Sequence, residues 1–143
     1  MIYDTSGTRR QDRLLPESKA LELLRDGEYG VLSMCCYDSA AYGVPVNYAW
    51  DGKEYIYIHC ATTGKKLECL DRNSSVSFCV VGRTRVIPER FATEYESIIL
   101  QCRAFANLHA EERMKALLLL VEKDSLGAVE KGEKYAEKYF HET

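Results

Sequence analysis

The stretch of residues 55–73, near the middle of the chain, combines residue types that could bind an anion. It reads YIYIHCATTGKKLECLDRN, beginning with the alternation typical of a strand and passing through small and hydroxyl residues to two lysines. After the lysines, Leu67 and Leu70 share one face of an amphipathic turn, and Asn73 is a suitable stop. The pattern predicts a strand, a loop and the N-terminus of a short helix.

Such a junction gathers several groups that favour a phosphate. Backbone N–H groups and the positive end of the helix dipole would lie beside Lys65 and Lys66. Gly64 would let the backbone approach an anion, and Thr62 or Thr63 could both cap the helix and donate a hydrogen bond. The spacing is not that of a Walker loop. The residues alone leave two interpretations open, an anion site and a solvated helix start.

Length and composition predict a single domain over residues 1–143. Of the 143 residues, 46% are hydrophobic, which is enough to build a core. The chain carries 19 basic and 22 acidic residues, a net charge of −3, and its small Arg9, Arg10 and Arg13 group does not indicate a nucleic-acid partner. No apolar run is long enough to predict a membrane span, and the polar start does not have the pattern of a signal peptide.

The cysteines, at positions 35, 36, 60, 69, 79 and 102, form no C-x-x-C motif and show no zinc-type spacing. Cys35 and Cys36 would point to opposite faces of a strand, and several others lie in apolar strand patterns where cysteine packs as a small hydrophobe. We therefore expect reduced thiols, no metal site and a cytoplasmic protein.

The elements that would position the junction are mainly antiparallel strands with flanking helices. Pro45 predicts an edge or a break in its strand, and Asp51-Gly52 predicts a hairpin turn. The expected order is an extended lead-in (1–14), a helix (16–26), strands at 29–37, 42–50 and 55–60, the short helix, a strand (75–81), a loop (82–92), a long strand (93–108), and C-terminal helices within 110–143, at 111–123 and 127–140. Strands of this number need closure or cover, which favours a small barrel flanked by helices.

Two of these elements carry a predicted core face. In the long strand, the more apolar set should face the core: Ile98, Leu100, Cys102, Ala104 and Ala106. In the helix at 111–123, the apolar stripe predicted for packing is Met114, Leu117, Leu118 and Val121.

Several segments, in this order, resemble the flavin-binding split-barrel superfamily of pyridoxamine 5′-phosphate oxidase, and in particular its nitroimidazole-resistance branch. The resemblance covers roughly residues 9–122. It rests on RRQDR before the first helix, on YGVLSMCCYDSAAYGVPVNYAWDGKEYIYIHCATTGKKLECLDRN, on SVSFCVV, and on FATEYESIILQCRAFA. It implies a small antiparallel, six-stranded type of split β-barrel with flanking helices, assembled as a homodimer.

The resemblance also implies FMN bound at the homodimer interface. The backbone of Val44, Pro45, Val46, Asn47 and Tyr48 would run beside the isoalloxazine ring. The ribityl chain and phosphate would be lined by His59, Cys60, Ala61 and Thr62, with Lys65 and Lys66 neutralising the phosphate. Ser97, near Tyr95 on the long strand, would come from the partner subunit. The implied activity is flavin-dependent reduction of a small organic molecule, such as a nitro compound.

The chemistry of these residues fits FMN. The lysines and helix start suit a phosphate dianion, and Val44, Val46, Tyr48 and Trp50 could supply a flat apolar slot. The basic substrate-binding residues and C-terminal extension of the true oxidases have no match here, so pyridoxamine phosphate oxidation is not expected. Alternatives left open are a non-enzymatic flavin or haem carrier, a deazaflavin protein, and a structural dimer without ligand.

The sequence identifies no catalytic residue. His59 is a weak candidate, either packed against tyrosines or placed to exchange a proton near the flavin and, for haem, the one well-placed histidine. Cys60 is expected to pack rather than to act as a nucleophile, because no base is spaced to activate it. The arginines at 9, 10 and 13 are read as solvent charge or as cover for the flavin pocket.

Overall fold

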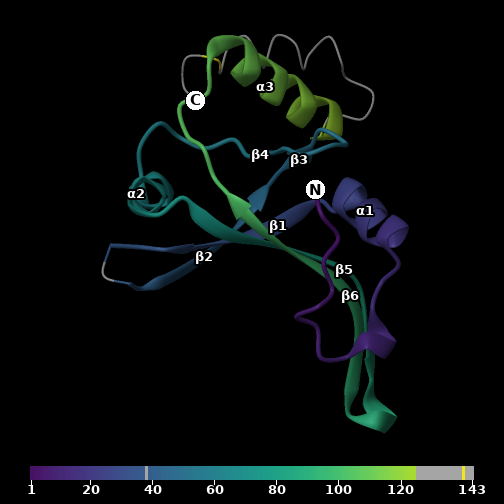
Figure 1. Ribbon diagram of the computed structural model, residues 1–143. Helices are drawn as coiled ribbons and strands as arrows, with labels where there is room; N and C mark the ends of the chain where they lie inside the picture. Colours follow the sequence, from purple (N-terminus) through teal and green to yellow (C-terminus); the bar gives the residue numbers. More distant parts are fainter. Residues whose placement is uncertain (38, 125–139, 141–143) are drawn as a thin grey trace.

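The computed structural model describes residues 1–37, 39–124 and 140 (Figure 1). Its elements, in chain order, are η1 (Gln11–Arg13), α1 (Glu17–Asp26), β1 (Tyr29–Cys35), β2 (Ala41–Asn47), β3 (Ala49–Trp50), β4 (Ile56–Tyr57), α2 (Lys65–Arg72), β5 (Ser75–Ile87), η2 (Pro88–Arg90), β6 (Ala92–Arg103) and α3 (Ala110–Asp124). The observed strands are mostly antiparallel and are flanked by helices, which confirms the expected fold class. The helix expected at 127–140 falls outside the described residues, apart from Phe140.

Four strands form one antiparallel sheet in the order β2-β1-β5-β6. Leu32 lies opposite Val44 on one side and opposite Phe78 on the other. Since directly opposed residues share a face, one face of the sheet carries these apolar side chains and the other carries the residues between them. The edge position of β2 confirms the prediction from Pro45, which pairs with Val31.

The strand expected at 42–50 is divided at Tyr48, and the strand expected at 55–60 is shorter than predicted. The two short pieces, β3 and β4, pair with each other as a separate antiparallel ribbon. The carboxylate of Asp51 accepts the backbone N–H groups of Lys53, Glu54 and Tyr55 at 2.9 to 3.0 Å, which closes the predicted hairpin. Burial alone would raise the pKa of Asp51, but these donors outweigh it and hold the pKa below its usual value.

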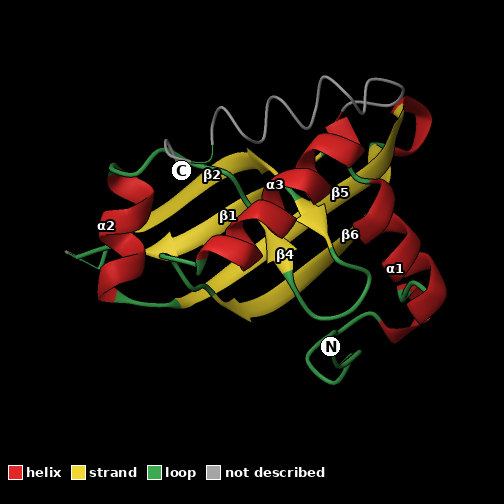
Figure 2. Ribbon diagram, turned by 90° about the horizontal axis from the view of Figure 1, so that it is seen from above, coloured by secondary structure: helices red, strands yellow, loops and turns green. Residues whose placement is uncertain are grey.

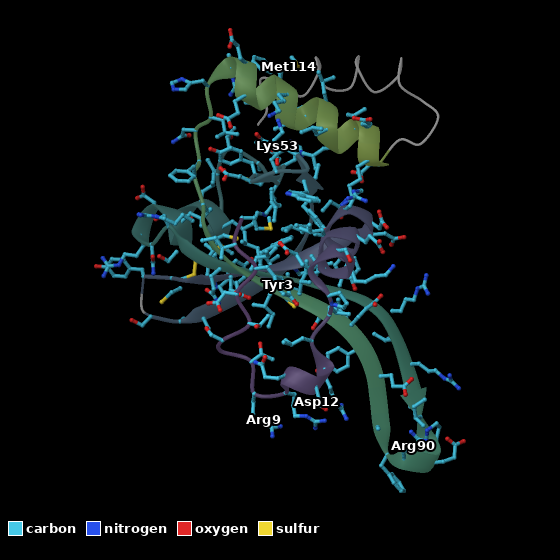
Figure 3. The ribbon with its side chains drawn as sticks, turned by 45° about the vertical axis from the view of Figure 1, so that its right-hand side comes forward. Tyr3, Arg9, Asp12, Lys53, Arg90 and Met114 are labelled. Atoms are coloured by element: carbon cyan, nitrogen blue, oxygen red, sulfur yellow. A yellow bond between two sulfur atoms is a disulfide. The ribbon has the colours of Figure 1, made fainter. Side chains whose placement is uncertain are left out.

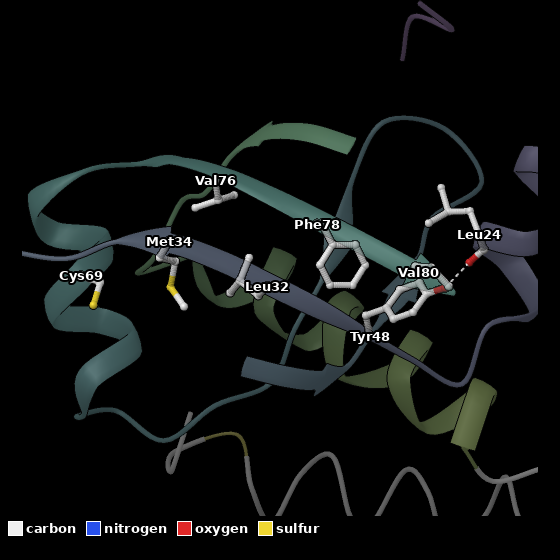
Figure 4. Close-up of a cluster of buried hydrophobic side chains, with 8 residues drawn as sticks. All are labelled: Leu24, Leu32, Met34, Tyr48, Cys69, Val76, Phe78 and Val80. Carbon is white, nitrogen blue, oxygen red and sulfur yellow. Dashed lines mark hydrogen bonds between the residues drawn. The ribbon is translucent and has the colours of Figure 1, made fainter. Parts of the chain in front are cut away.

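The core lies against one face of the four-stranded sheet (Figure 4). Its members are Leu24, Leu32, Met34, Tyr48, Cys69, Val76, Phe78 and Val80. The ring of Phe78 packs over Gly30, where an added Cβ would lie 2.3 Å from the ring, so this glycine is required by the close approach. The predicted core set of the long strand is confirmed for Ile98, Leu100 and Cys102 in β6 and for Ala104 just beyond its end. It is wrong for Ala106, which is exposed.

Helices cover this same side of the molecule. α1 buries Ala20 and Leu24, and α3 lies beyond the β3–β4 ribbon (Figures 1 and 2). The buried residues of α3 are Ala116, Leu117 and Leu120, whereas Leu118 is 40% exposed. The predicted stripe is confirmed for Leu117 and wrong for Leu118, and its other members, Met114 and Val121, are half-buried. The prediction left out Ala116 and Leu120, because hydrophobic residues occupy positions 116–121 without interruption and their spacing does not single out one face.

The prediction of a loop at 82–92 is wrong. β5 and β6 continue instead as a long hairpin arm, broken by a bulge between Val81 and Thr84 and closed by η2. The arm projects from the body of the chain, with Arg90 near its tip (Figures 1 and 3). Its polar and charged composition suggested a loop, but a two-stranded ribbon exposed on both faces has the same composition.

The second face of the sheet is open. Large apolar side chains on it remain exposed, including Tyr29 at 57%, Val81 at 52% and Ile99 at 67%. A shallow trough of about 540 Å³ crosses this sheet where Ser33, Ser77 and Gln101 lie side by side on the open face. An apolar patch of this kind on a sheet face is typical of a surface that is covered in an assembly.

Candidate anion-binding site

The predicted strand, loop and helix junction is present. β4 ends at Tyr57 and the chain reaches α2 at Lys65, so the helix begins where the sequence indicated. The N-cap residue is Gly64 with φ of 131°, a backbone conformation that favours glycine. Neither Thr62 nor Thr63 is the capping residue, and within the described part of the chain no side chain caps this end. The backbone N–H groups of the first turn thus remain available to a ligand.

A small cavity of about 90 Å³ lies at this helix end. Its lining residues are Tyr42, Cys60, Ala61, Thr63, Gly64, Lys65, Lys66 and Leu67. The structure therefore brings together four of the predicted site residues: Cys60, Ala61, Lys65 and Lys66. Thr62 is exposed and its neighbour Thr63 lines the cavity in its place. Two ammonium groups, a hydroxyl and a helix N-terminus form a donor set that suits a phosphate.

The two lysines differ in their surroundings. The ammonium group of Lys65 lies 4.6 Å from the ring centroid of Tyr42, a cation–π contact that holds it against β2. Lys66 is half-buried along the cavity wall. Tyr42 was not among the predicted site residues, because only the pairing of β2 with β1 brings it to the start of α2.

The predicted ring-binding strand divides its side chains between the two faces of the sheet. Val44 and Val46 pack against the core, whereas Pro45 and Asn47 are exposed on the open face. Tyr48 is fully buried, and its hydroxyl donates to the Leu24 carbonyl oxygen at 2.6 Å. The side chains of Val44, Val46 and Tyr48 therefore do not form an open apolar slot, which leaves the backbone and the alternate residues to meet a ligand.

Burial raises the pKa of Tyr48 to about 12, with a smaller contribution from Asp26. Its ring meets Phe78 edge-on, with centroids 5.0 Å apart. Because the hydroxyl stays protonated, it donates a hydrogen bond to a carbonyl group in the last turn of α1, where the carbonyl groups have no intrahelical partner. Tyr48 is thus a structural residue that connects helix and sheet.

The remaining predicted residues lie apart from the cavity. His59 is exposed just before it, on the segment between β4 and α2. Ser97 lies on β6 opposite Val81, on the open face and at the far edge of the sheet from β2. The N-terminal arginines are exposed, and Arg10 forms a salt bridge with Asp12 at 2.6 Å.

The expectation that all cysteines are reduced is wrong for one pair. Cys36 and Cys69 form a disulfide, with Cα atoms 4.3 Å apart. The prediction failed because the two residues are 33 positions apart and only the packing of α2 against the end of β1 makes them neighbours. Cys35, Cys60, Cys79 and Cys102 are free thiols, and burial raises the pKa of Cys102.

Neither a metal site nor a membrane helix is found in the described ranges. Residues 1–37, 39–124 and 140 contain no cluster of three or more histidine, cysteine or acidic side chains suited to a metal ion. No helix among the same residues combines the length and apolar character needed to cross a bilayer.

Residues 16–140 match the family model described as pyridoxamine 5′-phosphate oxidase. The chain therefore belongs to that family, which confirms the resemblance drawn from its motifs. A comparison with curated proteins gives no significant match.

Solved structures show the same fold at low sequence identity. A candidate 5-nitroimidazole antibiotic resistance protein from Bacteroides thetaiotaomicron superposes with a TM-score of 0.69 at 16% identity, covering 79% of this chain and 69% of the other. For a conserved hypothetical protein from Mycobacterium tuberculosis the TM-score is 0.78 at 15% identity, covering 93% and 79%. The FAD and heme binding protein from Mycobacterium smegmatis gives 0.68 at 15% identity, covering 81% and 57%.

Proposed function

We propose that this chain is a homodimeric, cytoplasmic flavoprotein that binds FMN at the subunit interface and reduces a small organic compound, such as a nitro compound. The observation that carries the proposal is the glycine-started helix α2, which presents Lys65 and Lys66 to a cavity in a chain of this family. Flavin-binding proteins among its structural neighbours support the same ligand class.

The size of the cavity supports a phosphate as the group bound there. Sites for whole ligands the size of a cofactor usually measure about 300 to 1,000 Å³, whereas this one measures about 90 Å³. Among the described residues, this cavity thus has room for the phosphate end and provides no walls for the ring. A second subunit is the natural source of those walls.

The open face of the sheet is our candidate for the subunit interface. Pro45 and Asn47 lie on that face at the β2 edge, and Ser97 lies on it at the β6 edge. Because a two-fold axis places the same patch of both subunits in contact, the partner's β6 edge would lie near β2. In this arrangement Ser97 would contact the FMN bound by the other subunit. The exposed side chains of Tyr29, Val81 and Ile99 would become buried between the subunits.

Each group then has a defined task. FMN would supply the electron-transfer chemistry. Lys66 and the α2 N–H groups would bind the phosphate, helped by Lys65, Thr63 and the neighbouring Thr62. The segment His59–Ala61 would follow the ribityl chain, and the backbone from Val44 to Tyr48 would orient the ring.

The first experiment is the visible absorption spectrum of the purified protein, with the released ligand identified by mass. Twin flavin bands with FMN near one per chain would support the proposal, whereas FAD or a deazaflavin would identify a different flavin. A sharp Soret band would instead indicate the haem-carrier alternative. A colourless protein that takes up no added FMN would refute flavin binding.

A lysine substitution tests the phosphate assignment. Lys66→Ala removes a charged donor from the cavity, so FMN should bind about 10- to 100-fold more weakly, the effect of losing one charge-assisted hydrogen bond. Quenching of flavin fluorescence measures the dissociation constant. Lys53→Ala is the matched control, because Lys53 is an exposed lysine on the β3–β4 turn (Figure 3). Equal affinities in the two variants would contradict the assignment.

A further inference from the structure

The Cys36–Cys69 disulfide joins the end of the sheet to the helix that carries the candidate site. Cys36 directly follows β1, and Cys69 is the fifth residue of α2. The helix N-terminus with Lys65 lies one turn from the bridge. The state of this bond therefore bears on how firmly the anion-binding end of α2 is held.

Cys36 is the fixed side of the bridge. Its backbone N–H donates to the Ala40 carbonyl oxygen at 3.0 Å, and its own carbonyl oxygen accepts the Ser39 N–H at 3.1 Å. These bonds close the β1–β2 turn independently of α2. Opening the disulfide would leave this turn in place and remove a restraint from the helix.

On the helix side, the bridge is the covalent member of a row of contacts with the β1–β2 hairpin. Lys65 lies over Tyr42 at 4.6 Å, and Arg72 lies over Tyr37 at 4.7 Å. Positions 65, 69 and 72 share one face of α2. Exposed cation–π contacts are weak compared with a covalent bond, so the disulfide is the strongest restraint in this row.

We propose that Cys36 and Cys69 form a reversible redox pair that orders the anion-binding helix when oxidised and loosens it when reduced. The consequence for ligand affinity rests on the proposed FMN site. Ordering α2 in advance removes a cost that binding would otherwise carry, so the oxidised protein should bind the phosphate end more tightly.

The redox step is a thiol–disulfide exchange with a dithiol reductant. A thiolate of the reductant attacks the Cys36 sulfur, the sulfur–sulfur bond breaks, and Cys69 leaves as a thiolate that takes up a proton. The second thiol of the reductant then releases Cys36, so two electrons pass to the protein and the reductant becomes a disulfide.

The geometry favours attack at Cys36. Cys69 is 2% exposed within the core cluster, whereas Cys36 is partly exposed and its neighbour Cys35 lies on the surface. Burial of the leaving sulfur in the core also keeps it near its partner, which makes reclosure by exchange with a small-molecule disulfide efficient.

The test compares the full-length protein without reductant and with excess dithiothreitol. Mass spectrometry of digested protein should find a bridged peptide pair containing Cys36 and Cys69 only in the first sample. Hydrogen exchange should be faster in residues 65–72 of the reduced protein, and its FMN dissociation constant should rise about tenfold, as expected for losing part of the preorganisation of one short helix.

Two variants sharpen the test. Cys36→Ser should behave like the reduced protein and lose its response to dithiothreitol. Cys35→Ser is the matched control, because this exposed free thiol lies next to the bridge and its loss should leave the response unchanged. If Cys36→Ser does not fold, the comparison of oxidised and reduced wild-type protein still tests whether the disulfide orders α2.

The outcomes distinguish the proposed redox pair from the proposed FMN-binding function. Absence of the bridged peptide, or equal exchange rates in both states, would overturn the redox pair. Redox-dependent exchange with unchanged FMN affinity would overturn its effect on binding. Redox-dependent exchange in a protein that binds no FMN in either state would support the redox pair as a structural device and refute the proposed function.

Discussion

The two faces of the β2-β1-β5-β6 sheet are built from the same strands, but one is buried and the other is exposed. On the covered face, Phe78 and Val80 are 2% and 0% exposed. On the open face, Val81 and Ile99 are 52% and 67% exposed. Helix α1 and the β3–β4 ribbon bury the first face within the chain, whereas the second keeps large apolar side chains in contact with solvent.

The difference shows which interactions one chain completes by itself. The covered face makes a core with aromatic contacts and a buried hydroxyl that has its hydrogen bond. The open face places Pro45, Asn47 and Ser97 on a surface where large apolar side chains remain exposed. On our proposal, the stability of the fold depends on the first face and flavin binding depends on the second.

The largest expected effect is on the covered face. Phe78→Ala removes a buried ring and should lower the free energy of unfolding by about 3 to 4 kcal/mol, as measured by urea denaturation. Val81→Ala on the opposite side of the same strand should cost less than about 1 kcal/mol at protein concentrations where the chain is monomeric. Similar losses in the two variants would remove the distinction between the faces.

A charge on the open face should act on assembly rather than on folding. Ile99→Glu would place a carboxylate in the proposed interface, so the dimer should dissociate at least tenfold more readily and release FMN. Analytical ultracentrifugation measures the association, with circular dichroism to verify the fold. Ile2→Glu, at a side chain 91% exposed in the N-terminal segment, is the control. A dimer that persists in Ile99→Glu would exclude this face as the interface.

The smallest effect concerns a single hydrogen bond in the core. Tyr48→Phe removes the bond to the Leu24 carbonyl and should cost about 1 kcal/mol. In the folded protein the pKa of Tyr48 is raised to about 12, mainly by burial, whereas in the unfolded chain it is near 10. The stabilisation is therefore complete below about pH 10 and is lost as the pH rises towards 12. Unfolding measured across this window should depend less on pH in the variant, and an unchanged dependence would contradict the assignment.

Much of the fold was predictable from local patterns. The helix at 16–26, the hairpin at Asp51-Gly52 and the helix start at Lys65 follow from capping, turn and periodicity signals that act over a few residues. The edge strand followed from Pro45, which cannot donate a ladder hydrogen bond. The family likewise followed from the order of short motifs, each weak alone.

The errors arose where distant segments decide the structure. The arm at 82–92 looked like a loop because its exposed ribbon carries polar residues, and only the pairing of β5 with β6 makes it a hairpin. The strand at 42–50 breaks at Tyr48 because that side chain inserts between α1 and Phe78. Local alternation cannot indicate such an insertion, since Tyr48 continues the pattern.

The sequence by itself determined the family, the class of fold and the position of two lysines at a helix start, because these depend on residue types at short spacing. Only the tertiary structure decided which side chains meet. It placed Tyr42 over Lys65, joined Cys36 to Cys69, and assigned Val44 and Val46 to the core while leaving Pro45 and Asn47 exposed. Strand register and helix packing set these contacts, and both depend on segments tens of residues apart.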